Sequence, residues 1–188
     1  MPDILLASQS PRRKQLLQWA EVDFDILIIP TDETYPAGLK PADVAVHIAR
    51  QKAEAVSEHA AGKTVIAADT IVVLGSDIIG KPKDREDAVQ TLLRLSGARH
   101  EVITGVVIRR EGREIAFADR TEVDFHSLTR EQIEFYVDKY QPYDKAGAYA
   151  IQEWIGVVGI KAVRGDFYNV MGLPVSRVVQ ALAEISPR

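Results

Sequence analysis

The hydrophobic pattern at the start of the chain predicts two strands and two helices. Ile4 to Ala7 is an apolar run typical of a short buried strand, and Ser10-Pro11 then supplies an N-cap and a first helical residue. Asp23 to Ile29 predicts a second strand. After a polar loop, Pro41 begins a longer helix that is expected to reach His59.

Two hairpins and a helix are predicted for the middle of the chain. Thr64 to Leu74 is rich in β-branched residues, and a Gly-Ser-Asp turn leads back into Ile78-Ile79. Asp84 can cap the helix that follows. Polar and apolar residues then alternate on both sides of Glu111-Gly112, which is typical of a longer hairpin. Its two predicted strands are Glu101 to Arg110 and Arg113 to Phe125.

The last third of the chain predicts two helices separated by an irregular stretch. Thr129 and Gln132 fit a capping box for the first helix, whereas Tyr143 to Gly172 is punctuated by glycine and shows little helical periodicity. Pro174 precedes the second helix. The apolar stripe of that helix contains Val175, Val178, Val179 and Leu182.

Together these elements predict a mixed α/β fold in which helices flank a twisted sheet. The length of 188 residues suits one compact domain or two lobes. Because no linker divides the chain, residues 1–188 are expected to form a single domain. The connections Gly80 to Lys83 and Tyr140 to Asp144 are the best positions for a boundary between lobes.

Composition removes several classes of function. The chain has no cysteine, which excludes disulfides, zinc–thiolate sites and a thiol nucleophile. Its formal net charge of −4 argues against nucleic acid as a partner. The N-terminus lacks a basic region, and no apolar run approaches the roughly 20 residues that span a bilayer. A cytoplasmic protein without a membrane partner is therefore expected.

A candidate anion site lies at the start of the first predicted helix. The segment Ser8-Gln9-Ser10-Pro11-Arg12-Arg13 adds two hydroxyls and two guanidinium groups to the free N–H groups of a helix N-terminus. The alternative is that Ser10 only caps a helix whose exposed first turn carries arginines. Because cations at a helix N-terminus oppose its dipole, a phosphate site is the favoured interpretation.

Two charged residues stand in apolar surroundings. Lys52 lies on the apolar face of its predicted helix, four residues after Ile48, and must either reach solvent or meet an anion. Asp69 interrupts the apolar run from Val65 to Val73, where an unpaired carboxylate is costly. The first could simply be a lysine that reaches solvent, and the second a hydrogen-bonded aspartate at a β-bulge. The Asp69 pattern favours a functional role.

Further charged residues complete a set suited to phosphate chemistry. Asp32 and Glu33 lie in a loop after a predicted strand, and with Asp69 they could supply the carboxylate oxygens that Mg²⁺ or Mn²⁺ prefers. Lys81 precedes Pro82 and is therefore held extended, although it could also be an ordinary surface lysine. Glycine-rich dinucleotide-binding and P-loop patterns are absent from the sequence. The set predicts phosphoryl or nucleotidyl chemistry on a polyphosphate.

Five short motifs follow one another between Ile4 and about Leu182. They are Ser8-x-Ser10-Pro11-Arg12-Arg13, Ala68-Asp69-Thr70, Gly80-Lys81-Pro82, Asp144-Lys145-Ala146-Gly147-Ala148-Tyr149-x-Ile151-Gln152 and Asn169-Val170-Met171-Gly172-Leu173-Pro174. In sequence and in order these motifs resemble those of the Maf family of nucleoside triphosphate pyrophosphatases.

The resemblance implies a fold, a reaction and a cofactor. The fold would be an elongated, two-lobed α/β domain with a central cleft, usually assembled as a homodimer. The enzyme would hydrolyse a nucleoside triphosphate between its α and β phosphates, with a divalent cation such as Mg²⁺, Mn²⁺ or Co²⁺. Two alternatives stay open: an inosine or xanthosine triphosphate pyrophosphatase, and a non-enzymatic inhibitor of septum formation.

The resemblance also implies roles for individual residues. Arg12, Thr70 and Gln152 match the family branch that acts on dTTP and UTP. Asp69 would accept the proton of the attacking water and, with Glu33, would bind the metal. The residues expected to hold the triphosphate are Ser8, Ser10, Arg13, Lys52 and Lys81.

The chemistry of Gln152 agrees with that branch. Its amide offers one donor and one acceptor group, so it could pair with the N3–H and a carbonyl of uracil or thymine. Many members of the family carry glycine directly after this glutamine, whereas this chain has Glu153. We therefore expect the backbone beside Gln152 to differ from the family's usual form.

Overall fold

The computed structural model describes residues 3–185 of the chain. Its strands are β1 (Ile4–Leu6), β2 (Asp25–Ile26), β3 (Thr64–Leu74), β4 (Asp77–Ile79), β5 (Arg99–Arg110), β6 (Arg113–Phe125) and β7 (Ile160–Arg164). Its helices are α1 (Pro11–Trp19), α2 (Pro41–Ser57), α3 (Arg85–Leu95), α4 (Arg130–Tyr140), the 3-10 helix η1 (Ala146–Ala148), α5 (Trp154–Gly159), α6 (Phe167–Met171) and α7 (Val175–Ile185).

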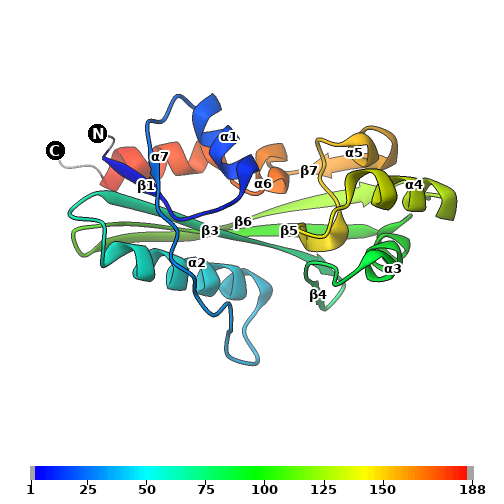
Figure 1. Ribbon diagram of the computed structural model, residues 1–188, viewed down its shortest axis with the longest axis horizontal. Coiled ribbons are helices and arrows are strands. Elements are labelled where there is room, and N and C mark those ends of the chain that lie inside the picture. Colours follow the sequence, from blue (N-terminus) through cyan, green and yellow to red (C-terminus); the bar gives the residue numbers. More distant parts are fainter. Residues whose placement is uncertain (1–2, 186–188) are drawn as a thin grey trace. The chain divides into compact units, whose positions relative to one another are not determined.

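The strands form a mixed sheet, and helices flank it (Figure 1). The strand order is β2-β1-β3-β5-β6-β7, and β4 pairs with β3 outside this path. β1 pairs in parallel with β2 and β3, whereas the β3–β4 and β6–β7 pairs are antiparallel. The predicted fold class, a mixed α/β arrangement, is therefore confirmed, as are both predicted hairpins.

The chain divides into two compact units. The first unit contains the residues up to Thr70, Thr104–Asp119 and the residues from Gly172, and the second contains Ile71–Ile103 and Arg120–Met171. The boundaries expected at residues 80–83 and 140–144 were wrong, because the chain passes between units inside β3, β5 and β6 and just before α7. Side chains alternate between the two faces along the whole of a long strand, even where the strand passes from one unit to the other. The sequence of such a strand therefore does not reveal the boundary between units.

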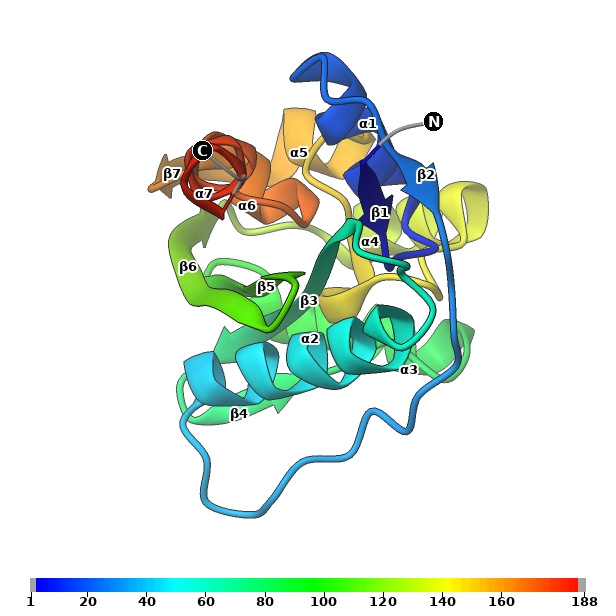
Figure 2. The same cartoon turned by 90° about the vertical axis from the view of Figure 1, so that its left-hand side faces the viewer.

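In the first unit, α2 lies along one face of the sheet and α7 along the other (Figure 2). Small side chains let α2 approach closely: a Cβ added to Gly105 of β5 would lie 2.3 Å from backbone atoms of both Ala45 and Val46. The buried cluster on this side consists of Leu5, Ala7, Ala49, Ala53, Val56, Ala60, Val65, Ala67 and Val107. This packing sets the position of the helix that carries Lys52.

We expect Gly105→Ala to lower the free energy of unfolding by about 2 to 3 kcal/mol, because the new methyl group would overlap the backbone of α2. Urea unfolding followed by circular dichroism measures the change. Gly80→Ala is the matched control, since a Cβ there meets no atom within 4 Å. Equal stability of the two variants would contradict the close contact between α2 and β5.

In the second unit, three buried rings attach a loop segment to the sheet. His100 of β5, Phe125 of β6 and Tyr149 pack edge to face, with centroids 5.1 to 5.5 Å apart. His100 Nε2 lies 2.7 Å from the Tyr149 hydroxyl oxygen. Burial lowers the pKa of His100 to about 4 and raises the pKa of Tyr149, so both rings are neutral near pH 7. Tyr149 thus anchors the segment that leads to Gln152.

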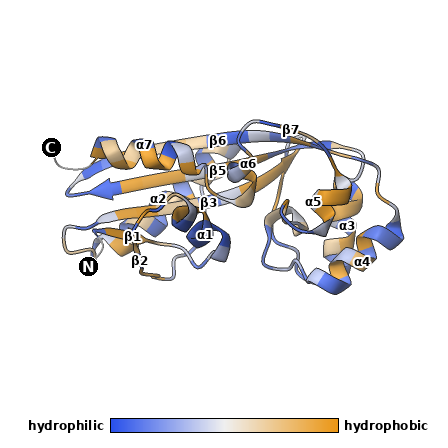
Figure 3. Cartoon of the chain, turned by 90° about the horizontal axis from the view of Figure 1, so that it is seen from above, coloured by the Kyte–Doolittle hydropathy of each residue, from blue (hydrophilic) through white to orange (hydrophobic). Residues whose placement is uncertain are grey.

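Two predicted elements differ in detail from the structure. The strand expected from Asp23 to Ile29 is reduced to Asp25–Ile26 at the edge of the sheet, where Ile26 is 44% exposed. In α7, Val178 is buried as predicted, but Val179 is exposed. The buried residues of α7 are Val178, Ala181 and Ile185. Hydrophobic residues also occur outside this buried face (Figure 3), so the sequence pattern did not identify the buried face correctly.

The stretch from Tyr143 to Gly172 holds more structure than its sequence indicated. It contains η1, α5, β7 and α6, none longer than six residues. Elements this short complete too few turns to show a period. No helix within residues 3–185 combines the length and the apolar character needed to cross a bilayer.

Candidate functional site

Arg13 is at the centre of a buried hydrogen-bond network in the first unit. The N-cap prediction is confirmed, since Ser10 Oγ accepts from the Arg13 amide at 3.4 Å. The Arg13 side chain turns inward and is 8% exposed. Its Nε donates to the Gly172 carbonyl at 2.8 Å, and its Nη1 donates to the Ala68 carbonyl at 2.8 Å and to Ser8 Oγ at 3.1 Å.

The remaining terminal nitrogen of Arg13 binds Thr70, whose Oγ1 accepts at 2.9 Å. Four hydrogen bonds to protein acceptors leave one of the five N–H groups of a guanidinium for any other acceptor. Burial lowers the pKa of Arg13, and the nearby Asp69 carboxylate opposes this effect. Arg13 therefore connects the start of α1 to β3 and to Gly172, and little of its donor capacity remains for a triphosphate.

Thr70 and Gly172 complete this network. The Thr70 hydroxyl oxygen lies 2.9 Å from Thr104 Oγ1 as well as from Arg13. Gly172 has φ of +117°, a conformation that side chains disfavour, and a Cβ there would lie 3.6 Å from Thr70 Oγ1 and 3.8 Å from Arg13 Nε. Gly172, in the last of the five motifs, thus contacts Arg13, in the first, through its main-chain carbonyl.

A second cluster joins three residues that lie far apart in the sequence. Lys52 Nζ of α2 lies 2.8 Å from Asp69 Oδ1 of β3 and 2.8 Å from Glu33 Oε1 of the loop before α2. The side chains of Lys52 and Asp69 are 17% and 14% exposed, whereas that of Glu33 is 49% exposed. Lys52 therefore meets anions, which is one of the two outcomes its position on the helix allowed.

The donor set of this cluster fits a divalent cation. Two carboxylates converge on one ammonium group, and Mg²⁺ is typically held by one or two carboxylates together with substrate phosphate oxygens. Within the described residues, no group of three or more Asp, Glu or His side chains is placed so that it could hold a metal ion. The protein would thus offer two carboxylates, and other ligands would have to come from the substrate or water.

The other predicted residues are distributed over both units. Ser8 is buried, and its Oγ also accepts from the Ser10 amide at 3.2 Å. Arg12 is half-buried on α1. Lys81, which follows β4, and Gln152, which precedes α5, belong to the second unit, and both are exposed.

The second unit contains a charged network that the sequence did not reveal. Lys145 is only 8% exposed, and its Nζ lies 2.7 Å from Asp144 Oδ1 and 3.8 Å from Glu153 Oε1. The Tyr136 hydroxyl of α4 donates a hydrogen bond to Glu153 Oε2. In the sequence, Tyr136 lies on the apolar stripe of its predicted helix, together with Ile133, Val137 and Tyr140. Only the charge pair Asp144-Lys145 in a glycine-rich stretch could therefore have indicated the network.

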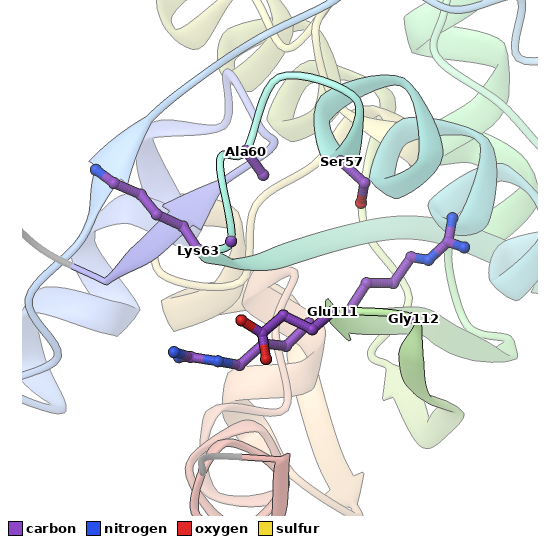
Figure 4. A pocket seen from close by; sticks show the side chains of 8 residues that line it. Ser57, Ala60, Lys63, Glu111 and Gly112 are labelled. Carbon is purple, nitrogen blue, oxygen red and sulfur yellow. The ribbon is translucent and has the colours of Figure 1, made fainter.

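A pocket in the first unit lies between the end of α2 and the β5–β6 turn (Figure 4), and its lining includes none of the predicted site residues. Its basic side chains already have partners. Lys63 pairs with Asp25 at 3.2 Å, Arg109 pairs with Glu54 at 3.4 Å, and Arg110 donates to Thr64 Oγ1 at 3.1 Å. This pocket therefore adds nothing to the phosphate chemistry.

Comparison with known proteins identifies a family. The model of the family described as "Maf-like protein" matches residues 3–185. A "dTTP/UTP pyrophosphatase" of Bacteroides thetaiotaomicron is 46% identical over 184 residues, which are 97% of this chain and 95% of that protein. A "dTTP/UTP pyrophosphatase" of Bacillus cereus is 45% identical over 184 residues, covering 98% of this chain and 96% of that protein.

Solved structures of lower sequence similarity share the fold. A HAM1 protein from Coxiella burnetii matches with a TM-score of 0.52 and 15% identity, covering 98% of this chain and all of that one. The Ham1 protein of Staphylococcus aureus matches with a TM-score of 0.54 and 19% identity, over 96% and 97% of the two chains. At these identities the likeness concerns the fold alone.

Proposed function

The chain belongs to the Maf family, and from this premise we propose that it hydrolyses dTTP and UTP to the nucleoside monophosphate and pyrophosphate. Relatives named "dTTP/UTP pyrophosphatase" are 45% to 48% identical to the chain. The observation that carries the proposal is the contact of Lys52 with both Asp69 and Glu33. It supplies a carboxylate base, a cation for phosphate and two oxygen ligands in one place.

Asp69 is assigned the role of proton acceptor. Water cleaves the anhydride bond between the α and β phosphates, the proton that the water loses passes to the carboxylate, and pyrophosphate leaves. Lys52 contacts the same carboxylate at 2.8 Å. It therefore orients Asp69, and its positive charge partly neutralises the negative charge of a bound triphosphate. Positioning and charge neutralisation supply most of the rate in reactions of this kind.

Asp69 and Glu33 are also the residues that would hold a divalent cation. When bound, such a cation neutralises phosphate charge and polarises the anhydride. We assign Ser10 and Arg12, at the start of α1, to the phosphate groups, where free N–H groups and the helix dipole favour an anion. Because Arg13 and Ser8 are bonded to each other and to the framework, we assign them chiefly to shaping this helix terminus.

Three residues carry the proposed preference for pyrimidines. Gln152 would pair with the N3–H and a carbonyl of uracil or thymine through its amide, and Arg12 and Thr70 match the same branch of the family. Lys81 is assigned to the phosphates. A cytoplasmic homodimer is proposed on the family resemblance, and sedimentation of the purified protein measures its oligomeric state.

A pyrophosphate-release screen tests the function. Wild-type protein with Mg²⁺ or Mn²⁺ is expected to turn over UTP and dTTP with a kcat/KM at least about tenfold above that for CTP, ATP, GTP, ITP and XTP. Preference for ITP or XTP would instead support a purine triphosphate pyrophosphatase. Absence of release from every triphosphate, together with DNA affinity that falls steeply with salt, would support the non-enzymatic alternative.

A further inference from the structure

The turn that carries Gln152 is closed at both ends by one buried hydroxyl group. Tyr136 of α4 is fully buried, and its Oη accepts from the Ala150 amide at 3.2 Å while it donates to Glu153 Oε2. The Glu153 amide in turn donates to the Ala150 carbonyl at 3.1 Å. The two residues that Tyr136 binds are therefore the first and last residues of the turn, and Gln152 lies between them.

Charge and packing hold the same turn from other directions. Glu153 Oε1 faces the buried Lys145 ammonium at 3.8 Å, so both carboxylate oxygens of Glu153 have a partner. On the α5 side, a Cβ added to Gly156 would lie 1.7 Å from the Ile151 carbonyl oxygen, so the helix backbone is packed directly against the turn. The backbone at Gln152 is thus fixed by buried groups.

The side chain of Gln152 is nevertheless exposed. A fixed backbone with an exposed amide is the arrangement that recognition of a flat hydrogen-bonding edge requires, since selectivity depends on placing the donor and acceptor within about half an ångström. A network that served stability alone would not need to close on the two ends of this particular turn.

We propose that Tyr136 and Glu153 are a positioning pair for Gln152, and that through it they set the selectivity of the enzyme for uracil and thymine. This inference rests on the proposed function. Neither residue is assigned a contact with substrate: they act by fixing the turn, and the Lys145 ammonium, 3.8 Å from Glu153 Oε1, helps to hold that carboxylate in place.

Kinetics of Tyr136→Phe, Glu153→Ala and Glu153→Gln test the pair, with UTP and CTP as the compared substrates. We expect Tyr136→Phe and Glu153→Ala to lower the UTP:CTP ratio of kcat/KM by about tenfold, the size of effect that one lost hydrogen bond produces. The loss should appear in KM for UTP, with kcat changed less than about threefold. Glu153→Gln keeps an acceptor for the Tyr136 hydroxyl and should retain most of the ratio.

Phe135→Leu is the matched control. Phe135 packs on Trp154 with ring centroids 4.9 Å apart, so this change weakens the contact between α4 and α5 without touching the turn. It should lower the melting temperature and leave the UTP:CTP ratio unchanged.

The outcomes separate this inference from the proposed function. A UTP:CTP ratio that stays at the wild-type value in Tyr136→Phe and Glu153→Ala, in a wild type that prefers UTP, overturns the positioning pair alone. A ratio that falls equally in Phe135→Leu also overturns it, because the effect would then be one of general stability. A wild type with no turnover of UTP or dTTP overturns the proposed function and this inference together.

Discussion

Replacing Asp69 with asparagine is expected to lower kcat for pyrophosphate release from UTP and dTTP by about 10²- to 10⁴-fold, the contribution typical of a general base. The amide has nearly the shape of the carboxylate but cannot accept the proton that the attacking water loses. Lys52 keeps its contact with Glu33 in this variant, so the fold should persist. Steady-state kinetics at saturating substrate, with circular dichroism to verify folding, measures the effect.

Asp43→Asn is the control for Asp69→Asn. Asp43 is an exposed carboxylate in the first turn of α2, the helix that also carries Lys52, so its variant removes one negative charge without altering the cluster. Its turnover should stay within about twofold of wild type, as expected of a surface change away from the proposed site. Unchanged turnover in Asp69→Asn would remove the proposed base from the mechanism.

Arg13→Met is expected to lower the free energy of unfolding by about 3 to 5 kcal/mol, a loss typical of breaking a buried charged network. Methionine is also a long, unbranched side chain, but it donates no hydrogen bond. The carbonyls of Ala68 and Gly172 would both lose the hydrogen bond from Arg13, and the Gly172 carbonyl would keep only the 3.4 Å contact with Thr70 Oγ1. A buried group left unsatisfied costs about 1 to 3 kcal/mol. Urea unfolding gives this value directly.

Arg12→Met separates the two neighbouring arginines. Arg12 is half-buried, so its replacement should lower stability by less than about 1 kcal/mol, as at other partly exposed positions, while turnover of UTP falls. Similar stability losses in Arg12→Met and Arg13→Met would contradict the structural role of Arg13. Such a result would return Arg13 to the group of residues that hold the triphosphate.

Local signals allowed most of the fold to be predicted from the sequence. Ser10 before Pro11, the Thr129–Gln132 capping box and the Glu111-Gly112 turn act within a few residues, and the structure contains all three. The division into two units could not be predicted in the same way. It depends on which strands are neighbours, and this information is spread over the whole chain.

The candidate site was predictable only where a residue type was costly in its local surroundings. Lys52 and Asp69 could be singled out because each is charged within an apolar pattern, and the structure pairs them. The inward orientation of Arg13 could not be foreseen, because two of its acceptors are main-chain carbonyls, which every residue possesses. The hydrogen-bonding role of Tyr136 could not be predicted either, because a tyrosine in the apolar stripe of a helix is expected to be an ordinary core residue.

The hydrogen bond from Arg13 to the Gly172 carbonyl has a consequence for how the protein is made. The two residues are separated by 159 positions, and the first unit also needs α7, which follows Gly172. During synthesis, the N-terminal helix emerges from the ribosome long before its acceptor exists. The hydrogen-bond network at the start of α1 therefore stays incomplete until the residues from Gly172 onward have also been synthesised.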